Sequence, residues 1–350
     1  MQKIVVLSLL ISLSFAGNSQ EVIRINLNEY KKHERQADLS EIASDISFIK
    51  LETNANCLIG EINGIFRCNK NLLILGNSKK NLFLFSENGS FIRQIGNLGK
   101  GPGEFLEIYG LTIDPISQHI FILDNGQVKM LEFSEKGDFI KESKLGFYST
   151  NLLAFGPGFV FYTGSPYAYR NDGCVLTQTD MDCKSIGKFH PIASRKGNPY
   201  SPGTLYPDNK EVCFWESIWD TVYAYNGTGV RPKYFFDQGK DRIPQKLQNN
   251  TKQMWSEIDK YFFLNGFKEF KNFIYFDAID LNRKSIRIVY DKIKKDGYYL
   301  NFQEKYSNWG FNNNFSGGPL FSPNYKLSAD EVACVYEMIN LKELLSNFKI

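Results

Sequence analysis

The feature that most constrains the fold is a repeat of 48 residues in the first half of the chain. The stretch Phe85–Arg93 (FSENGSFIR) returns as Phe133–Lys141 (FSEKGDFIK), and the preceding residues align without a gap, Asn71–Phe85 over His119–Phe133. Each copy contains an apolar run, a turn, an alternating run ending in Phe, a glycine turn and a final run. Four short strands in about 45 residues are typical of a β-propeller blade. The repeat therefore predicts an all-β propeller.

Weaker copies of the pattern predict further blades. The third runs from about Leu152 to His190, the fourth lies in EVCFWES and DTVYAYNGTGVRPKYFF, and the fifth in NFIYFDAID and SIRIVYDKIKKDGYYL. Only part of a sixth blade fits into the C-terminal residues. We therefore expect a six-bladed ring closed by an N-terminal strand, either Ile46–Thr53 (ISFIKLET) or the earlier VIRINL, because closure protects sheet edges.

Two stretches of the chain have helical rather than strand periodicity. Ile243–Phe263 has apolar residues near helical spacing, which predicts a helical insertion between blades four and five. The segment INLKELLSNF, close to the C-terminus, predicts a short terminal helix. The helical insertion is expected to pack against the rim of the propeller.

The glycine-rich stretch GNLGKGPGEF joins the first two copies of the repeat. It is not a phosphate-binding loop, because Lys100 is followed by glycine instead of Ser or Thr, and no helix can follow. We interpret it as a tight crossover between blades, in which glycines permit the path, proline stiffens it, a phenylalanine anchors it, and a glutamate accepts backbone hydrogen bonds or faces solvent. The residues assigned to this structural loop are Gly99, Gly101, Pro102, Gly103, Glu104 and Phe105.

The crossover, together with ISFIKLET before it and GGPLF near the end, resembles the six-bladed β-propeller family of secreted bacterial proteins, whose repeats are NHL-like. The resemblance covers the chain from about Glu21 to Ile350. It implies an exported propeller, a single domain spanning residues 20–350. It brings no general catalytic motif with it.

The first residues of the chain read as a secretory signal peptide. Lys3 precedes an apolar run from Ile4 to Leu13, and small residues follow, so cleavage is expected after Ala16 or Ser19. The run is shorter than the roughly 20 residues that span a bilayer. We therefore expect residues 1–19 to be removed from a protein that works in the periplasm or outside the cell, without a membrane span. No cysteine lies near the cut, so a lipid anchor is not expected.

Composition excludes some classes of partner. A formal net charge of +3 is too small to favour nucleic acid. The six cysteines include no CxxC pair, and the three histidines have no metal-ligand spacing, so we expect no cofactor and no resident metal. The disulfide state of the cysteines remains open. A monomer is expected.

The candidate site lies on one face of the predicted ring, where the crossovers meet the turns between second and third strands. Aromatic and acidic residues expected there suit a glycan, a peptide or an envelope protein as ligand. The proposed contacts are Tyr167, Tyr169 and Trp219, with Asp124, Asp220 and Asp277 as polar partners.

Other interpretations of the same residues stay open. The aromatic side chains can instead be packed between blades, and the aspartates can be turn residues that bind their own backbone. Six-bladed lactonases and lyases hold a metal with carboxylates in the channel, so Asp124, Asp277 and Asp280 make a hydrolase or lyase the alternative function. A structural part in an envelope assembly is the third possibility.

Overall fold

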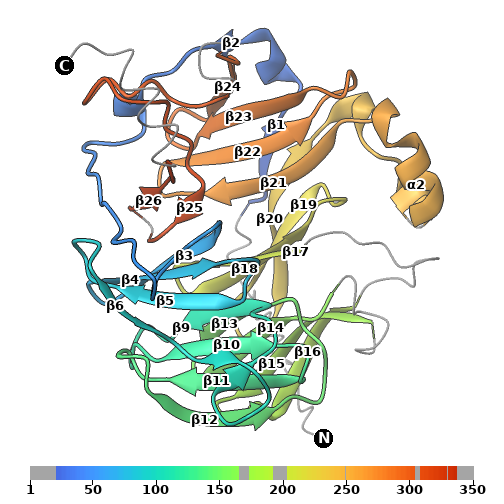
Figure 1. Ribbon diagram of the computed structural model, residues 1–350. Helices are drawn as coiled ribbons and strands as arrows, with labels where there is room; N and C mark the ends of the chain where they lie inside the picture. The colour runs from blue at the N-terminus through green and yellow to red at the C-terminus, as the bar shows by residue number, and fades with distance from the viewer. Residues whose placement is uncertain are drawn as a thin grey trace, which may run out of the picture.

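The computed structural model describes residues 21–164, 173–191, 203–248, 250–303, 308–328 and 330–336. The predicted signal peptide, Tyr167, Tyr169 and the predicted terminal helix lie outside these ranges. Within them, five antiparallel sheets of the expected up-and-down order are arranged as the blades of a β-propeller (Figure 1). The all-β propeller is therefore confirmed; the described residues form five blades, and the expected sixth is not confirmed.

The repeat of 48 residues forms the first two blades. Blade 1 contains β3 (Ile62–Cys68), β4 (Asn71–Gly76), β5 (Asn81–Phe85) and β6 (Phe91–Gln94). Blade 2 contains β9 (Gly110–Ile113), β10 (Ile120–Asp124), β11 (Lys129–Phe133) and β12 (Phe139–Lys144). Their middle strands are buried on both faces, because each blade packs between two neighbours. This double burial explains the continuous apolar runs in the sequence.

The weaker copies form the other three blades. Blade 3 contains β13 (Asn151–Phe155), β14 (Gly158–Tyr162), β15 (Cys174–Asp180) and β16 (Ser185–Pro191). Blade 4 contains β17 (Gly203–Asp208), β18 (Glu211–Glu216), β19 (Thr221–Tyr225) and β20 (Val230–Asp237). Blade 5 contains β21 (Phe263–Glu269), β22 (Phe273–Ile279), β23 (Ser285–Asp291) and β24 (Asp296–Leu300). An apolar cluster fills each interface between consecutive blades.

The N-terminal segment adds strands to the outside of two blades. β1 (Ile23–Asn26) pairs in parallel with β20, and β2 (Glu34–Arg35) pairs in parallel with β24, so each becomes the outermost strand of a five-stranded sheet. The two strands flank a 3₁₀ turn, η1 (Glu29–Lys32). The segment thus covers the outer edges of blades 4 and 5.

Of the two segments expected to close the ring, the earlier VIRINL contains β1, which pairs with β20 of blade 4, whereas residues 46–53 form no strand, so closure of the ring by an N-terminal strand is not confirmed. Residues 46–53 lie against the β5–β6 turn, where the Glu52 N–H donates to the Gly89 carbonyl at 2.8 Å. The N- and C-terminal segments meet elsewhere, beside η2 (Leu39–Glu41). There the Leu39 N–H donates to the Asn312 carbonyl at 2.8 Å, and the Asn312 N–H donates to the Ala37 carbonyl at 2.9 Å.

No regular sixth blade appears in the described residues. Residues 308–336 contain only the short pair β25 (Tyr325–Lys326) and β26 (Val332–Ala333) beside isolated bridges. The sequence NNNFSGGPLFSPN explains this, because glycine and proline weaken strands and proline removes a ladder donor. This segment links blades 5 and 1, since Lys326 donates to the Glu269 carbonyl and Tyr325 to the Ile62 carbonyl.

The glycine-rich crossover is a compact loop held by its own glutamate. A short parallel pair, β7 (Asn97–Leu98) and β8 (Glu104–Phe105), brings its ends together. The Gly101 N–H donates to Glu104 Oε2 at 2.7 Å, and the buried Phe105 ring anchors the loop between blades 1 and 2. Gly103 has φ +74°, a conformation that favours glycine, whereas a Cβ at Gly99 would overlap the Glu104 carboxylate.

The helical insertion between blades 4 and 5 is also present. It contains η4 (Gly239–Asp241), α1 (Gln245–Gln248), α2 (Thr251–Glu257) and η5 (Ile258–Lys260). Leu247 and Met254 are buried against Ile218 and Phe263, so the insertion packs against the β18–β19 turn and the start of β21. None of the helices in the described ranges is long and apolar enough to cross a membrane. The six cysteines are all unpaired.

Candidate functional site

The name "loop face" is used here for the side of the ring that carries the β10–β11, β18–β19 and β22–β23 turns and the crossovers between blades. Four of the predicted contacts, Asp124, Trp219, Asp220 and Asp277, lie in these turns or in the strands beside them. Each of the three aspartates has its own set of partners. The structure does not gather them into one site.

Asp124 is fully buried at the end of β10. Its Oδ2 accepts the Leu106 N–H at 2.9 Å and the Gln127 side-chain amide at 2.8 Å, and its Oδ1 accepts the Gly126 N–H at 2.9 Å. The carboxylate thus ties the crossover to the β10–β11 turn. This geometry is that of a turn residue, since no oxygen is left facing solvent.

The other two aspartates form ion pairs with arginine and lysine side chains. Asp220 pairs with Arg242 at 2.8 Å and accepts the Thr221 hydroxyl at 2.8 Å. Asp277 pairs with Arg287 at 2.6 Å and with Lys268 at 3.2 Å. In the described ranges no three side chains of His, Cys, Asp or Glu are grouped so that they can hold a metal ion.

Trp219 belongs to a cluster of four rings on the loop face of blades 3 and 4. We name it the aromatic cluster; its members are His190, Phe214, Trp219 and Tyr223. The His190 ring lies 4.3 Å from Tyr223 and 5.7 Å from Trp219, and Trp219 meets Tyr223 edge to face at 5.7 Å. Phe214 is buried beneath the other rings, which are partly exposed. Burial lowers the pKa of His190. Sequence reasoning found Trp219 but missed His190 and Tyr223, which lie in strands.

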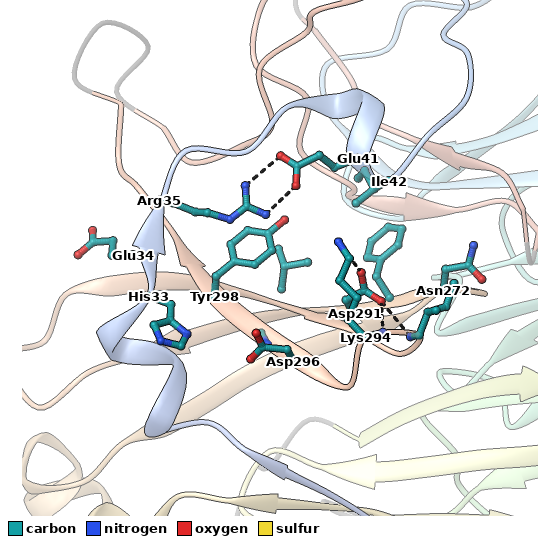
Figure 2. A pocket seen from close by; sticks show the side chains of 14 residues that line it. His33, Glu34, Arg35, Glu41, Ile42, Asn272, Asp291, Lys294, Asp296 and Tyr298 are labelled. Atoms are coloured by element: carbon teal, nitrogen blue, oxygen red, sulfur yellow. Dashed lines mark hydrogen bonds and ion pairs between the residues drawn. The ribbon is translucent and has the colours of Figure 1, made fainter.

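A cavity of about 500 Å³ lies at the opposite end of blade 5, away from the loop face. Its walls are the N-terminal residues 33–42, the β23–β24 hairpin and the start of β22 (Figure 2). β2 positions one wall, because its parallel pairing with β24 holds Glu34 opposite Tyr299 and Arg35 opposite Leu300. This cavity was not predicted from the sequence, since its walls are more than 220 positions apart along the chain.

The floor of the cavity is apolar and its rim is charged. Ile42, Phe273 and Val289 belong to the apolar cluster between blade 5 and residues 308–336, and Tyr298 packs against the same cluster. The Arg35 guanidinium lies 3.7 Å above the centre of the Tyr298 ring. The combination of an apolar floor and a few polar groups is typical of small-molecule sites.

Two ion pairs line the rim (Figure 2). Arg35 donates two hydrogen bonds to the Glu41 carboxylate, at 2.9 and 2.6 Å, and these bonds lower the pKa of Glu41. Asp291 accepts the Lys294 backbone N–H at 2.9 Å and lies 3.4 Å from its ammonium. Burial alone would raise the pKa of Asp291, but these backbone bonds outweigh it and lower the value. Both carboxylates are therefore ionised, and each is paired with a neighbouring cation, Arg35 or Lys294.

A second polar group, which we name the Glu269 cluster, lies where blades 4 and 5 meet. The Glu269 carboxylate is 3% exposed and accepts four bonds. Tyr206 and Lys233 donate to Oε2 at 2.9 and 2.6 Å, and Tyr234 and Lys292 donate to Oε1 at 2.5 and 2.7 Å. Burial alone would raise the pKa of Glu269, but the lysines and their hydrogen bonds outweigh it and lower the value from 4.5 to about 2.

The comparisons with known proteins concern the family and the fold. The family described as "Domain of unknown function (DUF4934)" matches residues 22–350. No curated protein matches the chain. A solved structure described as a "Putative exported protein" from Bacteroides fragilis is 20% identical, with a TM-score of 0.66 and 80% of each chain covered.

Two further solved structures are less similar. A member of the family duf4221 from Bacteroides vulgatus is 10% identical, covers 71% of this chain and 83% of its own, and has a TM-score of 0.47. BamB from Moraxella catarrhalis is 12% identical, covers 68% of this chain and 75% of its own, and has a TM-score of 0.41. At these identities the similarity concerns the fold alone. Of the three structures, the Bacteroides fragilis protein, with a TM-score of 0.66, supports the shared fold.

Proposed function

This chain belongs to the DUF4934 family, whose model matches residues 22–350, and we propose that it is an exported binding protein whose loop face receives a glycan. Export is supported by the signal-peptide pattern of residues 1–19 and by the description of the similar Bacteroides fragilis protein. The proposed place of action is the periplasm or the cell exterior, and the proposed state is a monomer.

The observation that carries this proposal is the aromatic cluster. His190, Trp219 and Tyr223 are partly exposed, and the Asp220–Arg242 ion pair lies in the same loop region. Ring faces and edges pack against the apolar side of a sugar ring, while carboxylate and guanidinium groups bind its hydroxyls. We propose Trp219 as the principal contact and Asp220 as its polar partner.

The other predicted contacts enter the proposal differently. Tyr167 and Tyr169 stay proposed contacts, because the β14–β15 loop that contains them starts on the same face. Asp277, already bound to two cations, is proposed only as part of the polar edge. We assign Asp124 to the turn and not to the ligand, because its burial leaves no oxygen for one.

A glycan array followed by calorimetry tests the proposal. Trp219→Ala should weaken binding of the ligand found by about 1 to 3 kcal/mol, the range of aromatic anchors at interfaces, and Trp219→Phe should weaken it less. Trp255→Ala is the matched control, because Trp255 is 42% exposed on α2, outside the aromatic cluster.

Two outcomes would contradict the glycan proposal. Equal losses from the two alanine variants would show that the aromatic cluster is not the contact. Binding of a peptide or an envelope protein through Trp219, with no glycan bound, would keep the surface but change the class of ligand.

A further inference from the structure

We propose that the cavity between the N-terminal segment and blade 5 is a second binding site, which takes an amphipathic organic amine. This site is separate from the loop face, and the inference does not depend on the glycan proposal. The ligand class follows from the charges that line the cavity, from the groups they already bind and from the shape of the floor.

The lining carries more negative than positive charge. Four carboxylates and two cations give a formal charge of −2 with histidine counted as neutral: Glu34, Glu41, Asp291 and Asp296 against Arg35 and Lys294. The two cations are each engaged by a carboxylate, Arg35 by Glu41 and Lys294 by Asp291. The carboxylates left over are those of Glu34 and Asp296.

Glu34 and Asp296 lack cationic partners among the residues that the structure describes. Asp296 Oδ1 accepts one backbone bond, from the Gly297 N–H at 2.8 Å, and Glu34 accepts none. Both are exposed, and Figure 2 shows them toward the His33 end of the cavity, with Asp296 below Tyr298 and Glu34 extending from the outer side of β2. A positively charged ligand group therefore finds its counter-charges at this end of the cavity.

An anion is disfavoured at the same place. The Arg35 guanidinium already donates two bonds to Glu41 and one to the Gln36 carbonyl, and its plane is stacked on the Tyr298 ring. An anion would have to break the Arg35–Glu41 pair and would meet two unpaired carboxylates. Electrostatic complementarity of this kind discriminates by the sign of the ligand's charge.

The floor of the cavity requires an apolar part in the ligand. The side chains of Ile42, Phe273 and Val289, which line the cavity, are hydrocarbon, so a bare ammonium ion or a metal cation makes no use of them. The Tyr298 hydroxyl has no hydrogen-bond partner in the described part of the chain and supplies one donor and acceptor beside the floor. The volume of about 500 Å³ suits a molecule with an alkyl or aryl chain and an amine head.

Calorimetry and saturation-transfer NMR with four probes test the inference. Hexylamine carries both the charge and the alkyl chain, hexanoate reverses the charge, hexanol removes it, and methylamine removes the chain. Hexylamine should bind at least about tenfold more tightly than each of the other three, and added salt should weaken its binding, because the ion pairs at the rim are screened.

A double variant locates the site. Glu34→Gln with Asp296→Asn should weaken hexylamine about tenfold, as expected when charged hydrogen bonds are replaced by neutral ones. The matched control is Glu87→Gln with Asp45→Asn, since both residues are exposed and Asp45 likewise accepts the N–H of the next residue. The control pair should bind hexylamine like the parent, and all melting temperatures should agree, because the four side chains are exposed.

Three results would overturn the inference. If hexylamine does not bind detectably, the cavity is not an amine site. If hexanoate or hexanol binds as tightly as hexylamine, the charge of the ligand does not determine binding. An equal loss in the control variant would show a general effect of surface charge. The glycan assay at Trp219 is unaffected by any of these results, so the two proposals fail separately.

Discussion

Replacing Glu269 by glutamine tests whether the Glu269 cluster holds blades 4 and 5 together. Glutamine keeps the shape of the side chain and removes its charge, which leaves Lys233 and Lys292 facing a neutral amide in a buried site. The lowering of the pKa from 4.5 to about 2 measures how strongly the fold prefers the ionised form. At 1.36 kcal/mol per pKa unit this lowering corresponds to about 3 kcal/mol. Glu269→Gln should therefore lower the free energy of unfolding by about 3 kcal/mol at pH 7.

The pH dependence gives the sign of the effect. The pKa of Glu269 is lower in the folded than in the unfolded chain, so its contribution to stability is complete well above pH 4.5 and is lost as the pH falls toward about 2. The difference in the free energy of unfolding between the parent and Glu269→Gln should shrink to less than half at pH 3 and vanish below pH 2.

Urea unfolding followed by tryptophan fluorescence measures this gap, since the chain has four tryptophans. Glu87→Gln is the control, because Glu87 is exposed in the β5–β6 turn. A Glu269→Gln midpoint equal to that of the parent at pH 7, or a gap that does not change with pH, would refute the assignment of Glu269 as the charged centre of the cluster.

Three further predictions concern stability and can be checked by the same unfolding assay. Gly103→Ala should cost about 1 to 2 kcal/mol, because φ is +74° and the new Cβ would lie 3.0 Å from the Phe139 ring, whereas Lys100→Ala should leave the midpoint unchanged. Asp124→Ala should cost about 2 to 3 kcal/mol, since it leaves buried N–H groups without an acceptor. Deletion of residues 21–27 should lower the midpoint and cause association detectable by light scattering, because it uncovers the edge of β20. Parent-like behaviour of Gly103→Ala, of Asp124→Ala or of the deletion would contradict the corresponding contact.

The sequence predicted those parts of the fold whose contacts are close along the chain. The strands of blades 1 and 2 recur at the interval of 48 residues that the repeat shows, β5 at Asn81–Phe85 and β11 at Lys129–Phe133. Hairpin turns and alternating burial are local properties, so a single sequence carries them. The all-β class, the order of the five blades and the helical insertion followed from them.

The contacts of the N-terminal segment were not predictable in the same way. β1 lies beside β20, and Arg24 pairs with Asp237 across 213 positions of sequence. Ile46–Thr53 has the apolar pattern of a strand, yet the segment has no strand geometry. A period-2 pattern shows that a segment suits a sheet but not which edge it joins, so the sequence left Ile46–Thr53 and VIRINL as alternatives, of which the second contains β1.

The candidate sites show the same division. Trp219 was found because an aromatic residue in a turn is visible in the sequence, but its ring partners His190 and Tyr223 become visible only when blades 3 and 4 are packed together. The Glu269 cluster draws its members from strands and turns of blades 4 and 5, so no spacing in the sequence reveals it.

The N-terminal segment forms one wall of the cavity in addition to covering the outer edges of blades 4 and 5. The walls are residues 33–42 on one side and blade 5 on the other, so a ligand inside the cavity contacts both and binds only while the segment is attached. By mass action, a ligand at a hundred times its dissociation constant stabilises that attachment by about 2.7 kcal/mol. The strands β1 and β2, the contact of Leu39 with Asn312 and the occupied cavity would then stabilise one another. If the cavity binds an amine as proposed, that binding would thereby be coupled to the contact of Leu39 with Asn312.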